Sequence, residues 1–399
     1  MSENAMQEKL ESQPTRDTLA NGVPYFEQAP RVVFARPRPA NASAHETASQ
    51  DGLAREIARL FGWKFQPEGD DFGEYRHSHR PYYVPGDTLV DSPAQAGAAP
   101  PRIGGHGDLF GGMVPYPFVA TKAITHALFD HDAQRPPGWS VEFGRRVQEA
   151  VLRGTTVFCI QDAHRAGAEL LRHGPIRLKP VDGTAGRGQR LLKDMAALEA
   201  AIDECDSRAL ATQGLVLEEH LEKVATLSVG KVQIGSLLST YVGTQSLTTD
   251  NTGASVYGGS DLRLAHGDFE ALLALALTDL EREAIRLARL YDEAAMSCYR
   301  GLYASRRNYD IAHGRDAAGT VKLGVLEQSW RPGGASMAEV LALEAFLQQP
   351  QLRSVRAFTH ERYGEAANPP RNARLTYRGD DEKVGFITKC AGIYSYDDG

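Results

Sequence analysis

The spacing of apolar residues divides the 399-residue chain into predicted strands and helices. Residues 31–36 form the short apolar run that is typical of a buried strand, and residues 47–63 place Leu53 and Ile57 at helical spacing. A strand followed by a helix indicates a small α/β unit at the start of the folded chain. Residues 1–29 are polar and lack periodicity, so we expect them to be disordered.

The middle of the chain alternates predicted helices with predicted strands. Apolar periodicity favours helices at 119–130, 140–152, 162–172 and 193–204. Short apolar runs favour strands at 176–180, 215–221 and 227–242. The run of elements that begins at residue 176 is compact and self-contained, which indicates a subdomain.

Glycine-rich stretches and further periodic segments complete the prediction. Residues 104–117 and 249–261 are typical of loops, because glycine adopts backbone conformations that are closed to other residues. The remaining predicted elements are a helix at about 268–295, a hairpin at 307–328, a helix after Gly334, and strands at 355–364 and 383–396.

Composition and charge exclude several classes of protein. Hydrophobic residues make up 42% and charged residues 24%, as in ordinary globular proteins, and the length suits two to three packed subdomains. A net charge of -7 argues against general nucleic-acid binding. We expect no membrane-spanning helix, since no apolar run reaches about 18 residues. The polar N-terminus lacks the apolar core of a signal peptide, and the four cysteines match no zinc motif, so we expect a cytoplasmic protein.

Two acids of the predicted hairpin should stand opposite each other. Opposed residues of an antiparallel hairpin have sequence numbers of constant sum, so a turn centred on residues 318–319 pairs Asp310 with Glu327. The same register opposes Ile311 to Leu326. Two carboxylates with Cβ atoms roughly 5 Å apart repel unless a cation lies between them. A Mg²⁺ ion bridged to phosphates fits such a pair best.

An alternative is that each of these acids pairs with a nearby base. The chain offers Arg306, Arg307, Lys322 and Arg331 for this purpose. A slip of one residue in the register would also place the two acids on opposite faces of the sheet. Ser329 follows Glu327 on the same face and could supply a further oxygen.

A glycine-rich segment follows a predicted strand that ends at Lys179. Gly183, Gly186 and Gly188 would let backbone N–H groups close over phosphate oxygens, while the lysine supplies charge. The segment is not a Walker A loop, because no Gly-Lys-Ser/Thr closes it, and its glycine spacing is not that of a Rossmann fingerprint. A plain glycine turn is the alternative.

Other candidate residues flank this segment in the sequence. Lys122 lies on the predicted helix at 119–130, where a solvated surface lysine is the alternative. Glu218 and Glu219 end the predicted strand at 215–221. A carboxylate or backbone carbonyl at that point can accept the exocyclic amine of adenine, and a charged strand terminus is the alternative.

In their order along the chain these pieces resemble the ATP-grasp superfamily, which includes D-alanine–D-alanine ligase, glutathione synthetase and biotin carboxylase. The resemblance covers residues 115–345 and rests on Lys122, Lys179 with its glycines, Glu218 in LEEHL, Asp310, and Glu327 with RPGG. The whole chain also resembles a proteobacterial family of unknown function. The resemblance implies an α/β (α+β) ATP-grasp fold, with an N-terminal α/β pre-grasp domain and two α+β subdomains that enclose a nucleotide.

The resemblance also implies how the chain is divided and what it binds. The parts would be a disordered N-terminus (1–29), a pre-ATP-grasp domain (30–118), a helical linker with the first part of the grasp domain (119–174), a lid subdomain (175–245), and a C-terminal grasp subdomain with the metal hairpin (246–399). ATP and Mg²⁺ are the implied ligands. An unknown acid and an unknown amine are the implied partners, and a homodimer is allowed.

Each matching position takes a role from the resemblance. Lys122 and Lys179 would contact the α- and β-phosphates, under a lid loop formed by Gly183, Gly186 and Gly188. The adenine site would consist of Glu218, Glu219 and Leu221, with a backbone N–H from Leu221. Asp310 and Glu327 would hold Mg²⁺, with Ser329 beside them.

Catalytic and acceptor roles follow in the same way. Arg306 or Arg307 would serve the γ-phosphate or an acyl phosphate, and Arg331 is the third catalytic candidate. Gly333 and Gly334 open a predicted helix and could receive an anionic substrate group. The acceptor side would be lined by His106, Asp108, the 249–261 loop and the RPGG turn.

Two positions depart from the pattern of the superfamily. Its members usually carry Asn two residues after the metal-binding Glu, where this chain has Ser329, whose hydroxyl is a shorter ligand. The acid that binds ribose has no clear equivalent near Thr226, and Glu222 is the nearest acid.

The reaction that the resemblance implies is ligation. A carboxylate attacks the γ-phosphate to give an acyl phosphate, and an amine or thiol then displaces phosphate, while the protein supplies positioning and charge neutralisation. The alternatives are a small-molecule kinase and a non-catalytic nucleotide-binding regulatory protein. Ser329 keeps the last of these open.

Overall fold

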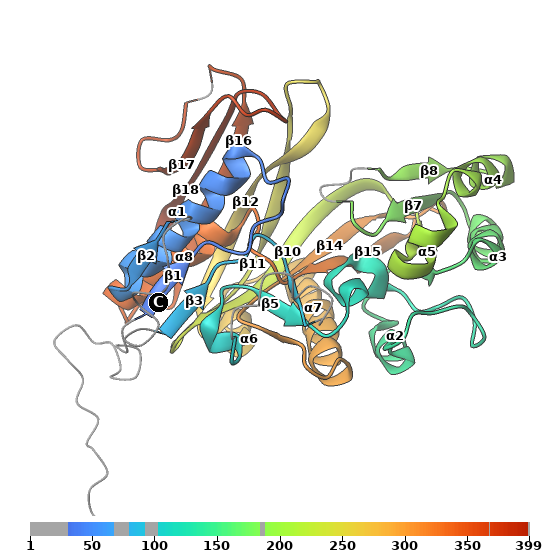
Figure 1. Cartoon of the computed structure of the whole chain (residues 1–399), viewed down its shortest axis with the longest axis horizontal. Coiled ribbons are helices and arrows are strands. Elements are labelled where there is room, and N and C mark those ends of the chain that lie inside the picture. The colour runs from blue at the N-terminus through green and yellow to red at the C-terminus, as the bar shows by residue number, and fades with distance from the viewer. Residues whose placement is uncertain (1–30, 68–79, 92–102, 184–187, 367, 398–399) are drawn as a thin grey trace, which may run out of the picture.

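The computed structural model describes residues 31–67, 80–91, 103–183, 188–366 and 368–397 (Figure 1). The predicted disorder of residues 1–29 lies outside the described residues. Within the described ranges the chain is a mixed α/β structure whose strands form four sheets. None of the helices in these ranges is long and apolar enough to span a bilayer.

An antiparallel sheet of eight strands forms the body of the molecule. The predicted hairpin, β14–β15, makes one edge of this sheet. Across the sheet the strands are β15 (Val321–Ser329), β14 (Arg306–Arg315), β10 (Glu222–Ile234), β11 (Leu237–Thr249), β12 (Ser255–His266), β16 (Ser354–Tyr363), β18 (Ile387–Asp397) and β17 (Arg374–Gly379).

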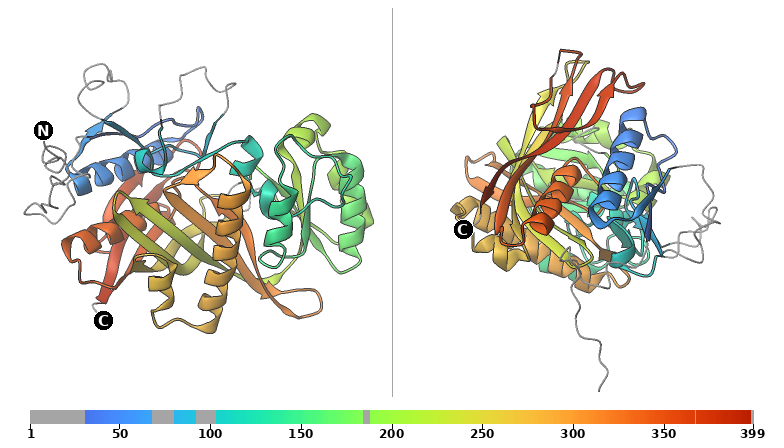
Figure 2. Two further views of the ribbon diagram at one scale, coloured as in Figure 1. Left: turned by 90° about the horizontal axis from the view of Figure 1, so that it is seen from below. Right: turned by 90° about the vertical axis from the view of Figure 1, so that its left-hand side faces the viewer.

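Helices cover both faces of this sheet (Figure 1). On one face α6 (Phe269–Leu273) and α7 (Asp279–Cys298) pack over β10, β11 and β14. On the other face α8 (Ser336–Gln348) and α1 (Ala44–Phe61) lie side by side, as the right-hand view of Figure 2 shows. Since side chains alternate along a strand, Tyr241 of β11 packs under α8 while Val242 belongs to the core under α7.

A four-stranded antiparallel sheet forms a smaller subdomain beside the hairpin (Figure 1). Its strands, in order, are β6 (Gly154–Val157), β9 (Leu215–Glu219), β7 (Ile176–Pro180) and β8 (Arg190–Leu192). One face packs on α3 (Ile160–Leu171), α4 (Met195–Asp203) and α5 (Ser207–Gln213). The opposite face carries Val216, which joins the main core together with Ile311 of the hairpin.

The N-terminal part contains the predicted α/β unit. In its parallel sheet β1 (Arg31–Phe34) lies between β2 (Lys64–Gln66) and β3 (Arg80–Tyr83), and α1 packs against it. At the start of α1 the Glu46 carboxylate accepts the Ser43 N–H (2.7 Å), and Gly62 ends the helix with a φ of 65°. The other elements are β4 (Leu89–Val90), β5 (Gly112–Val114), β13 (Tyr303–Ala304) and α2 (Val141–Val147).

The predicted helix at 119–130 is wrong. The 3₁₀ helices η6 (Pro117–Ala120) and η7 (Lys122–Thr125) occupy its first half, and a third, η5 (His106–Asp108), lies in the predicted loop at 104–117. Thr121 separates η6 from η7, because its hydroxyl accepts the Ala123 N–H (3.2 Å) and caps the second helix. Lys122 therefore stands at the start of a short, anchored turn.

The predicted helix at about 268–295 is two helices, α6 and α7. Thr278 and Glu281 form a capping box that starts the second one. The Glu281 carboxylate accepts the Thr278 N–H (2.7 Å), and the Thr278 hydroxyl accepts the Glu281 N–H (3.2 Å). This T-x-x-E pattern is a signal for a helix start within an otherwise continuous apolar periodicity.

The predicted loop at 249–261 is wrong over its second half, which begins strand β12. A Cβ atom at Gly259 would lie 2.0 Å from the carbonyl oxygen of Thr359 on β16. Glycine is needed here because two strand backbones approach each other closely, and not because the chain forms a loop.

Candidate nucleotide and metal site

The hairpin β14–β15 opposes Asp310 to Glu327, as predicted. The predicted pairing of Ile311 with Leu326 is wrong, because the register shifts there and Ile311 faces Val325. Leu326 is therefore the extra residue of a β-bulge. The bulge, and not a regular ladder, brings the two acids opposite each other on one face of the sheet.

Asp310 lies in a polar environment that only partly offsets its burial. Its Oδ1 accepts hydrogen bonds from Gln245 Nε2 (2.7 Å), Asn308 Nδ2 (2.8 Å) and Ser228 Oγ (3.2 Å). Burial raises the pKa of Asp310, and the facing charge of Glu327 raises it further against these hydrogen bonds. A cation near the two carboxylates would relieve both effects.

Glu327 forms an ion pair with Lys122, whose Nζ lies 2.8 Å from Oε2. The same Nζ donates to the backbone carbonyl of Gly183 (2.5 Å). Lys122 is 5% exposed, which excludes a solvated surface lysine. One ammonium group thus joins the metal hairpin to the first glycine of the predicted phosphate loop. Gly188, at the far end of that loop, has a φ of 73°, and Gly186 lies outside the described residues.

Lys179 belongs to a buried group of three charged or titratable side chains. It donates to Glu218 Oε1, and His126 Nε2 lies 2.9 Å from Glu218 Oε2. All three residues are at most 4% exposed. Burial opposes ionisation of Glu218, but Lys179 and His126 outweigh it, so the pKa of Glu218 is lowered. The carboxylate of Glu218 therefore neutralises Lys179 in this state of the protein.

Lys122 and His126 stand at the two ends of η7, which contacts both the hairpin and the small subdomain. Thr125 Oγ1 donates to the Leu326 carbonyl (3.2 Å). Gln328 Nε2 donates to the backbone carbonyl of Thr121, just before η7 (2.6 Å). The segment therefore fixes the Lys122–Glu327 ion pair on β15 and the His126–Glu218 hydrogen bond on β9 at once.

An apolar cluster lies where the small subdomain meets the hairpin. It consists of Leu152, Leu221 and Ala312, with Leu326 packed against it. The Leu221 N–H donates no backbone hydrogen bond to the described residues. A purine base packs its face on apolar surface and accepts an N–H at a ring nitrogen on its edge, so the cluster suits the role that the sequence suggested for Leu221.

The neighbouring acids are placed differently. The Glu219 carboxylate accepts the Arg153 N–H (2.8 Å) on the outer side of β9. Glu222 is exposed at the start of β10, where it pairs with Arg315 in the ladder. Neither side chain joins the apolar cluster around Leu221.

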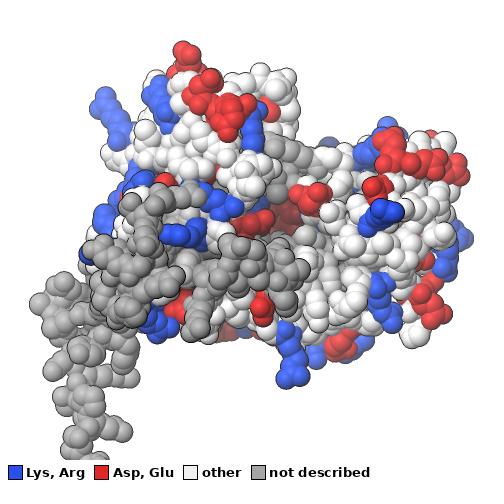
Figure 3. Space-filling view, viewed as in Figure 1, with Lys and Arg blue, Asp and Glu red and all other residues white. Residues whose placement is uncertain are grey.

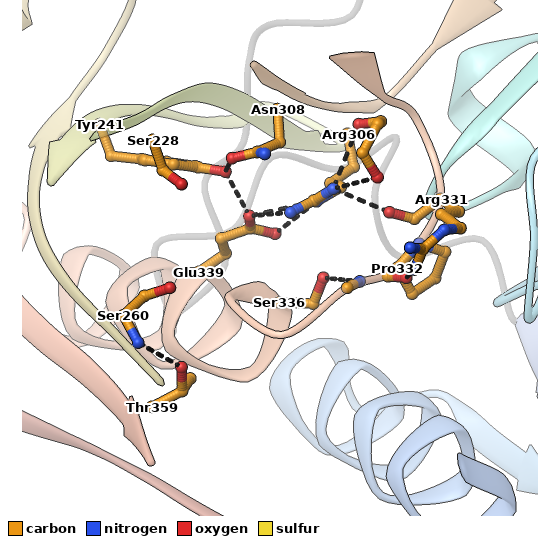
Figure 4. A network of polar contacts seen from close by, with 12 residues as sticks. Ser228, Tyr241, Ser260, Arg306, Asn308, Arg331, Pro332, Ser336, Glu339 and Thr359 are labelled. Carbon is orange, nitrogen blue, oxygen red and sulfur yellow. Dashed lines mark hydrogen bonds and ion pairs between the residues drawn. The ribbon is translucent and has the colours of Figure 1, made fainter. Parts of the chain in front are cut away.

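Two of the three candidate catalytic arginines are held by acids. Arg306 is 2% exposed and places Nε and Nη2 at 2.9–3.1 Å from the Glu339 carboxylate of α8 (Figure 4). Arg307 donates from Nη1 to both oxygens of Asp292 (3.0 and 3.1 Å). These contacts do not support a role for either guanidinium at a γ-phosphate. Arg331, on the loop after β15, lies 3.9 Å from Asp87 and is 36% exposed.

Ser329 faces Asn308 directly across the hairpin. Its Oγ lies 3.5 Å from Arg306 Nη1, and its carbonyl accepts from the same nitrogen (3.2 Å). Asn308 was not among the residues chosen from the sequence. Its signal was available, because a residue two positions before Asp310 in a strand must lie on the same face.

The residues expected on the acceptor side are gathered only in part: a Cβ at Gly334 of the RPGG turn would lie 2.5 Å from the ring of Tyr257 in the 249–261 segment. The Asp108 carboxylate is bound by Arg31 (3.0 Å) and Arg80 (3.0 Å), while His106 is exposed on η5. Gly333 donates its N–H to Ser336 Oγ (2.9 Å), which partly satisfies the N-terminus of α8.

Two surface cavities lie beside the candidate site. One of about 210 Å³ is lined by His173, Glu219 and Asp316, and one of about 510 Å³ is lined by Asp182 and Gly188. Neither is lined by the two opposed acids. Figure 3 shows acidic side chains in a recess at the centre of the face that is seen in Figure 1. Among the described residues no three His, Cys, Asp or Glu side chains are grouped to hold a metal, so an ion here would need oxygens from a ligand.

A family model described as "Protein of unknown function (DUF3182)" matches residues 33–391. The chain belongs to the DUF3182 family. The DUF3182 protein is similar to the biotin carboxylase domain of 2-oxoglutarate carboxylase from Hydrogenobacter thermophilus, with a TM-score of 0.51 and 11% identity over 91% of this chain and 86% of that one. It is also similar to N5-carboxyaminoimidazole synthetase from Staphylococcus aureus, with a TM-score of 0.50 and 10% identity over 92% and 93% of the two chains.

Both of these enzymes are ATP-grasp proteins, and the DUF3182 protein shares their fold. The H. thermophilus structure contains MgADP, ADP and bicarbonate. A search of curated protein sequences returned no match to the DUF3182 protein. The ATP-grasp fold that the order of lysines, glycines and acids indicated is thus confirmed.

Proposed function

We propose that this protein is an ATP- and Mg²⁺-dependent ligase that joins a carboxylate to an amine or a thiol. The observation that carries the proposal is the arrangement of Asp310, Glu327 and Lys122. Two carboxylates face each other on one strand pair, and a buried ammonium links one of them to the phosphate loop at Gly183. A divalent ion would match the two carboxylates, and a nucleotide phosphate would match the ammonium.

The residues present fit a Mg²⁺ ion that is shared with a nucleotide. Asp310 and Glu327 offer hard oxygen ligands, and the pKa of Asp310 is raised first by burial and then by the facing charge of Glu327. Two protein carboxylates are typical of a Mg²⁺ site that is completed by substrate phosphates. When bound, the ion would neutralise charge that develops on the transferred phosphoryl group.

The two lysines would serve the phosphates. Lys122 and Lys179 are held by Glu327 and Glu218, so each ammonium is already fixed by a carboxylate before a phosphate arrives. Positive groups at these positions would stabilise the negative charge of the phosphates. The adenine base would lie against the cluster around Leu221 and accept its N–H.

The reaction would run in two steps. A carboxylate oxygen attacks the γ-phosphorus and ADP leaves, which gives an acyl phosphate. A nitrogen or sulfur nucleophile then attacks the acyl carbon, and phosphate leaves as the nucleophile loses its proton. The chain would contribute position and charge, with Arg331 as its remaining candidate near the acyl group.

The test is ADP release from ATP and Mg²⁺ with a panel of acids and amines. Bicarbonate belongs in the panel because the H. thermophilus structure contains it. We expect one acid–amine pair to release ADP and phosphate together with a new amide or thioester. Asp310→Asn and Glu327→Gln should each reduce this turnover by about a thousandfold, the range of a lost charge-stabilising group.

Other outcomes would replace the proposal. A stable phosphorylated product without an amide would mean a kinase. Tight ATP binding without turnover across the panel would mean a nucleotide-binding regulatory protein. Unchanged turnover in both acid variants would remove Asp310 and Glu327 as metal ligands.

A further inference from the structure

Asn308 connects the metal hairpin to a buried tyrosine. Its Nδ2 lies 2.8 Å from Asp310 Oδ1. Its Oδ1 lies 2.9 Å from the hydroxyl of Tyr241 on β11 (Figure 4). The Tyr241 hydroxyl also lies 2.7 Å from Glu339 Oε1. Asn308 is 7% exposed, while Tyr241 and Glu339 are fully buried, so water does not readily replace these partners.

A count of protons shows that the chain of contacts is not satisfied as it stands. A tyrosine hydroxyl has one proton and can donate to one acceptor. Glu339 accepts from Arg306 as a carboxylate, and a charged acceptor forms the stronger bond. The Tyr241 proton therefore goes to Glu339, and Asn308 Oδ1 is left facing a hydroxyl oxygen at 2.9 Å with no proton between them.

Rotation of the Asn308 amide by 180° resolves this conflict at the Tyr241 end. The amide has nearly the same shape in both orientations. After rotation Nδ2 donates to the Tyr241 oxygen, which is then both a donor and an acceptor. The rotated Oδ1 stands where Nδ2 stood, 2.8 Å from Asp310 Oδ1.

Two oxygens then face each other at Asp310, and either a proton on its carboxyl group or a cation can join them. Oxygen ligands lie about 2.1 Å from Mg²⁺ and therefore about 3 Å from one another around the ion. Asp310 Oδ1 keeps two donors, Gln245 and Ser228, after Asn308 ceases to donate. No movement of the backbone is required for the exchange.

We propose that Asn308 is a third protein ligand of the divalent ion, through its amide oxygen. The proposal rests on the proposed function, because it extends the same metal site. It also accounts for the lack of an amide oxygen at Ser329. The guanidinium of Arg306 lies 3.5 Å from Ser329 Oγ and repels a cation there, whereas the facing position across the hairpin supplies an amide.

The experiment measures Mn²⁺ binding to the full chain in the presence of ADP, by the loss of the free Mn²⁺ signal in electron paramagnetic resonance. Asn308→Asp keeps an oxygen and removes the N–H donor, and Asn308→Leu removes both. We expect the Asp variant to bind Mn²⁺ within about threefold of wild type and the Leu variant to bind it at least about tenfold more weakly.

A purely structural Asn308, which only donates to Asp310, predicts something else. Both variants lose that donor, and the Asp variant also gains a negative charge, so weakened Mn²⁺ binding in both variants would overturn the proposal. Ser228→Ala is the matched control, since it removes a hydrogen bond to the same Asp310 oxygen without removing the amide. A tenfold loss of Mn²⁺ affinity in Ser228→Ala would likewise show that the loss in the Asn308 variants comes from a missing hydrogen bond to Asp310.

Folding and the parent site are tested separately. Metal-free ADP affinity and the thermal midpoint show whether each variant is folded, and the Asp variant keeps the test decisive if the Leu variant unfolds. Asp310→Asn should lose Mn²⁺ binding as well. If Asp310→Asn binds Mn²⁺ normally, the metal site of the proposed function fails. If it loses Mn²⁺ while Asn308→Leu does not, only the role of Asn308 fails.

Discussion

Lys122 places its ammonium nitrogen 2.8 Å from Glu327 Oε2, on the carboxylate that faces Asp310. The lysine thus supplies, without any ligand, part of the positive charge that a pair of opposed carboxylates requires. A metal ion at the same acids would compete with this ammonium, unless phosphate oxygens draw the lysine away.

That competition predicts the behaviour of Lys122→Met. Without nucleotide, we expect Mn²⁺ to bind the variant more tightly than wild type by about 1 kcal/mol, the upper range for a partly exposed ion pair. ADP should bind more weakly, because a phosphate contact is lost. Calorimetric titrations with Mn²⁺ alone and with ADP measure both effects. Lys231→Met, which breaks a pair with Asp268 on the other face, is the control and should change neither.

The raised pKa of Asp310 predicts a stability that depends on pH. The ordinary value of 3.8 is exceeded in the folded protein, so folding favours the protonated form. This contribution is present at low pH and is lost as pH rises from 3.8 through the higher folded pKa. Without metal, Asp310→Asn should therefore gain stability over wild type as pH rises. Urea unfolding in chelator between about pH 4 and pH 8 measures the difference. A stability difference between Asp310→Asn and wild type that is the same at every pH would contradict the expectation.

The contribution of Glu218 to stability depends on pH in the opposite direction. Its pKa is lowered from 4.5, so its contribution to stability is present above that value and is lost as pH falls through the lower folded pKa. We expect Glu218→Gln to be less stable than wild type at neutral pH, by roughly 3–5 kcal/mol, because Lys179 is left as an unpaired buried charge. In acid unfolding the variant should lack this part of the pH dependence. A variant that loses stability in acid as steeply as wild type would speak against the assignment.

The buried pair of Arg306 and Glu339 predicts a stability difference rather than a catalytic one. Glu339→Gln leaves the guanidinium uncompensated and should cost roughly 3–5 kcal/mol in the free energy of unfolding. The double change Arg306→Met with Glu339→Leu should recover most of that loss, since it removes both charges. Urea unfolding of the two variants is the measurement. Equal destabilisation of both would show that the pair is not the source.

The sequence predicted the acid pair correctly but by an incomplete route. Alternation and a turn at residues 318–319 sufficed to oppose Asp310 to Glu327. The observed turn pairs Arg315 with Val321, one residue away from the predicted register, and the bulge at Leu326 restores the alignment. A bulge leaves no trace in apolar spacing, because it adds one residue without changing the character of the strand.

Contacts between distant segments were beyond a reading of the sequence. His126 meets Glu218 across 92 positions, and Arg306 meets Glu339 across 33. No local pattern reports that a lysine or an arginine will be held by a particular acid, so the catalytic role of Arg306 and Arg307 was taken from the resemblance alone. The capping box at Thr278, in contrast, was readable and would have divided the long helix correctly.

The short helix η7 has a consequence for the spacing of the whole site. A 3₁₀ helix advances about 2 Å per residue, so the four steps from Lys122 to His126 cover about 8 Å. One end is held by the strand that carries Glu327 and the other by the strand that carries Glu218. The number of residues in this segment therefore sets the distance between its two attachment points. One inserted residue would change that distance by about 2 Å.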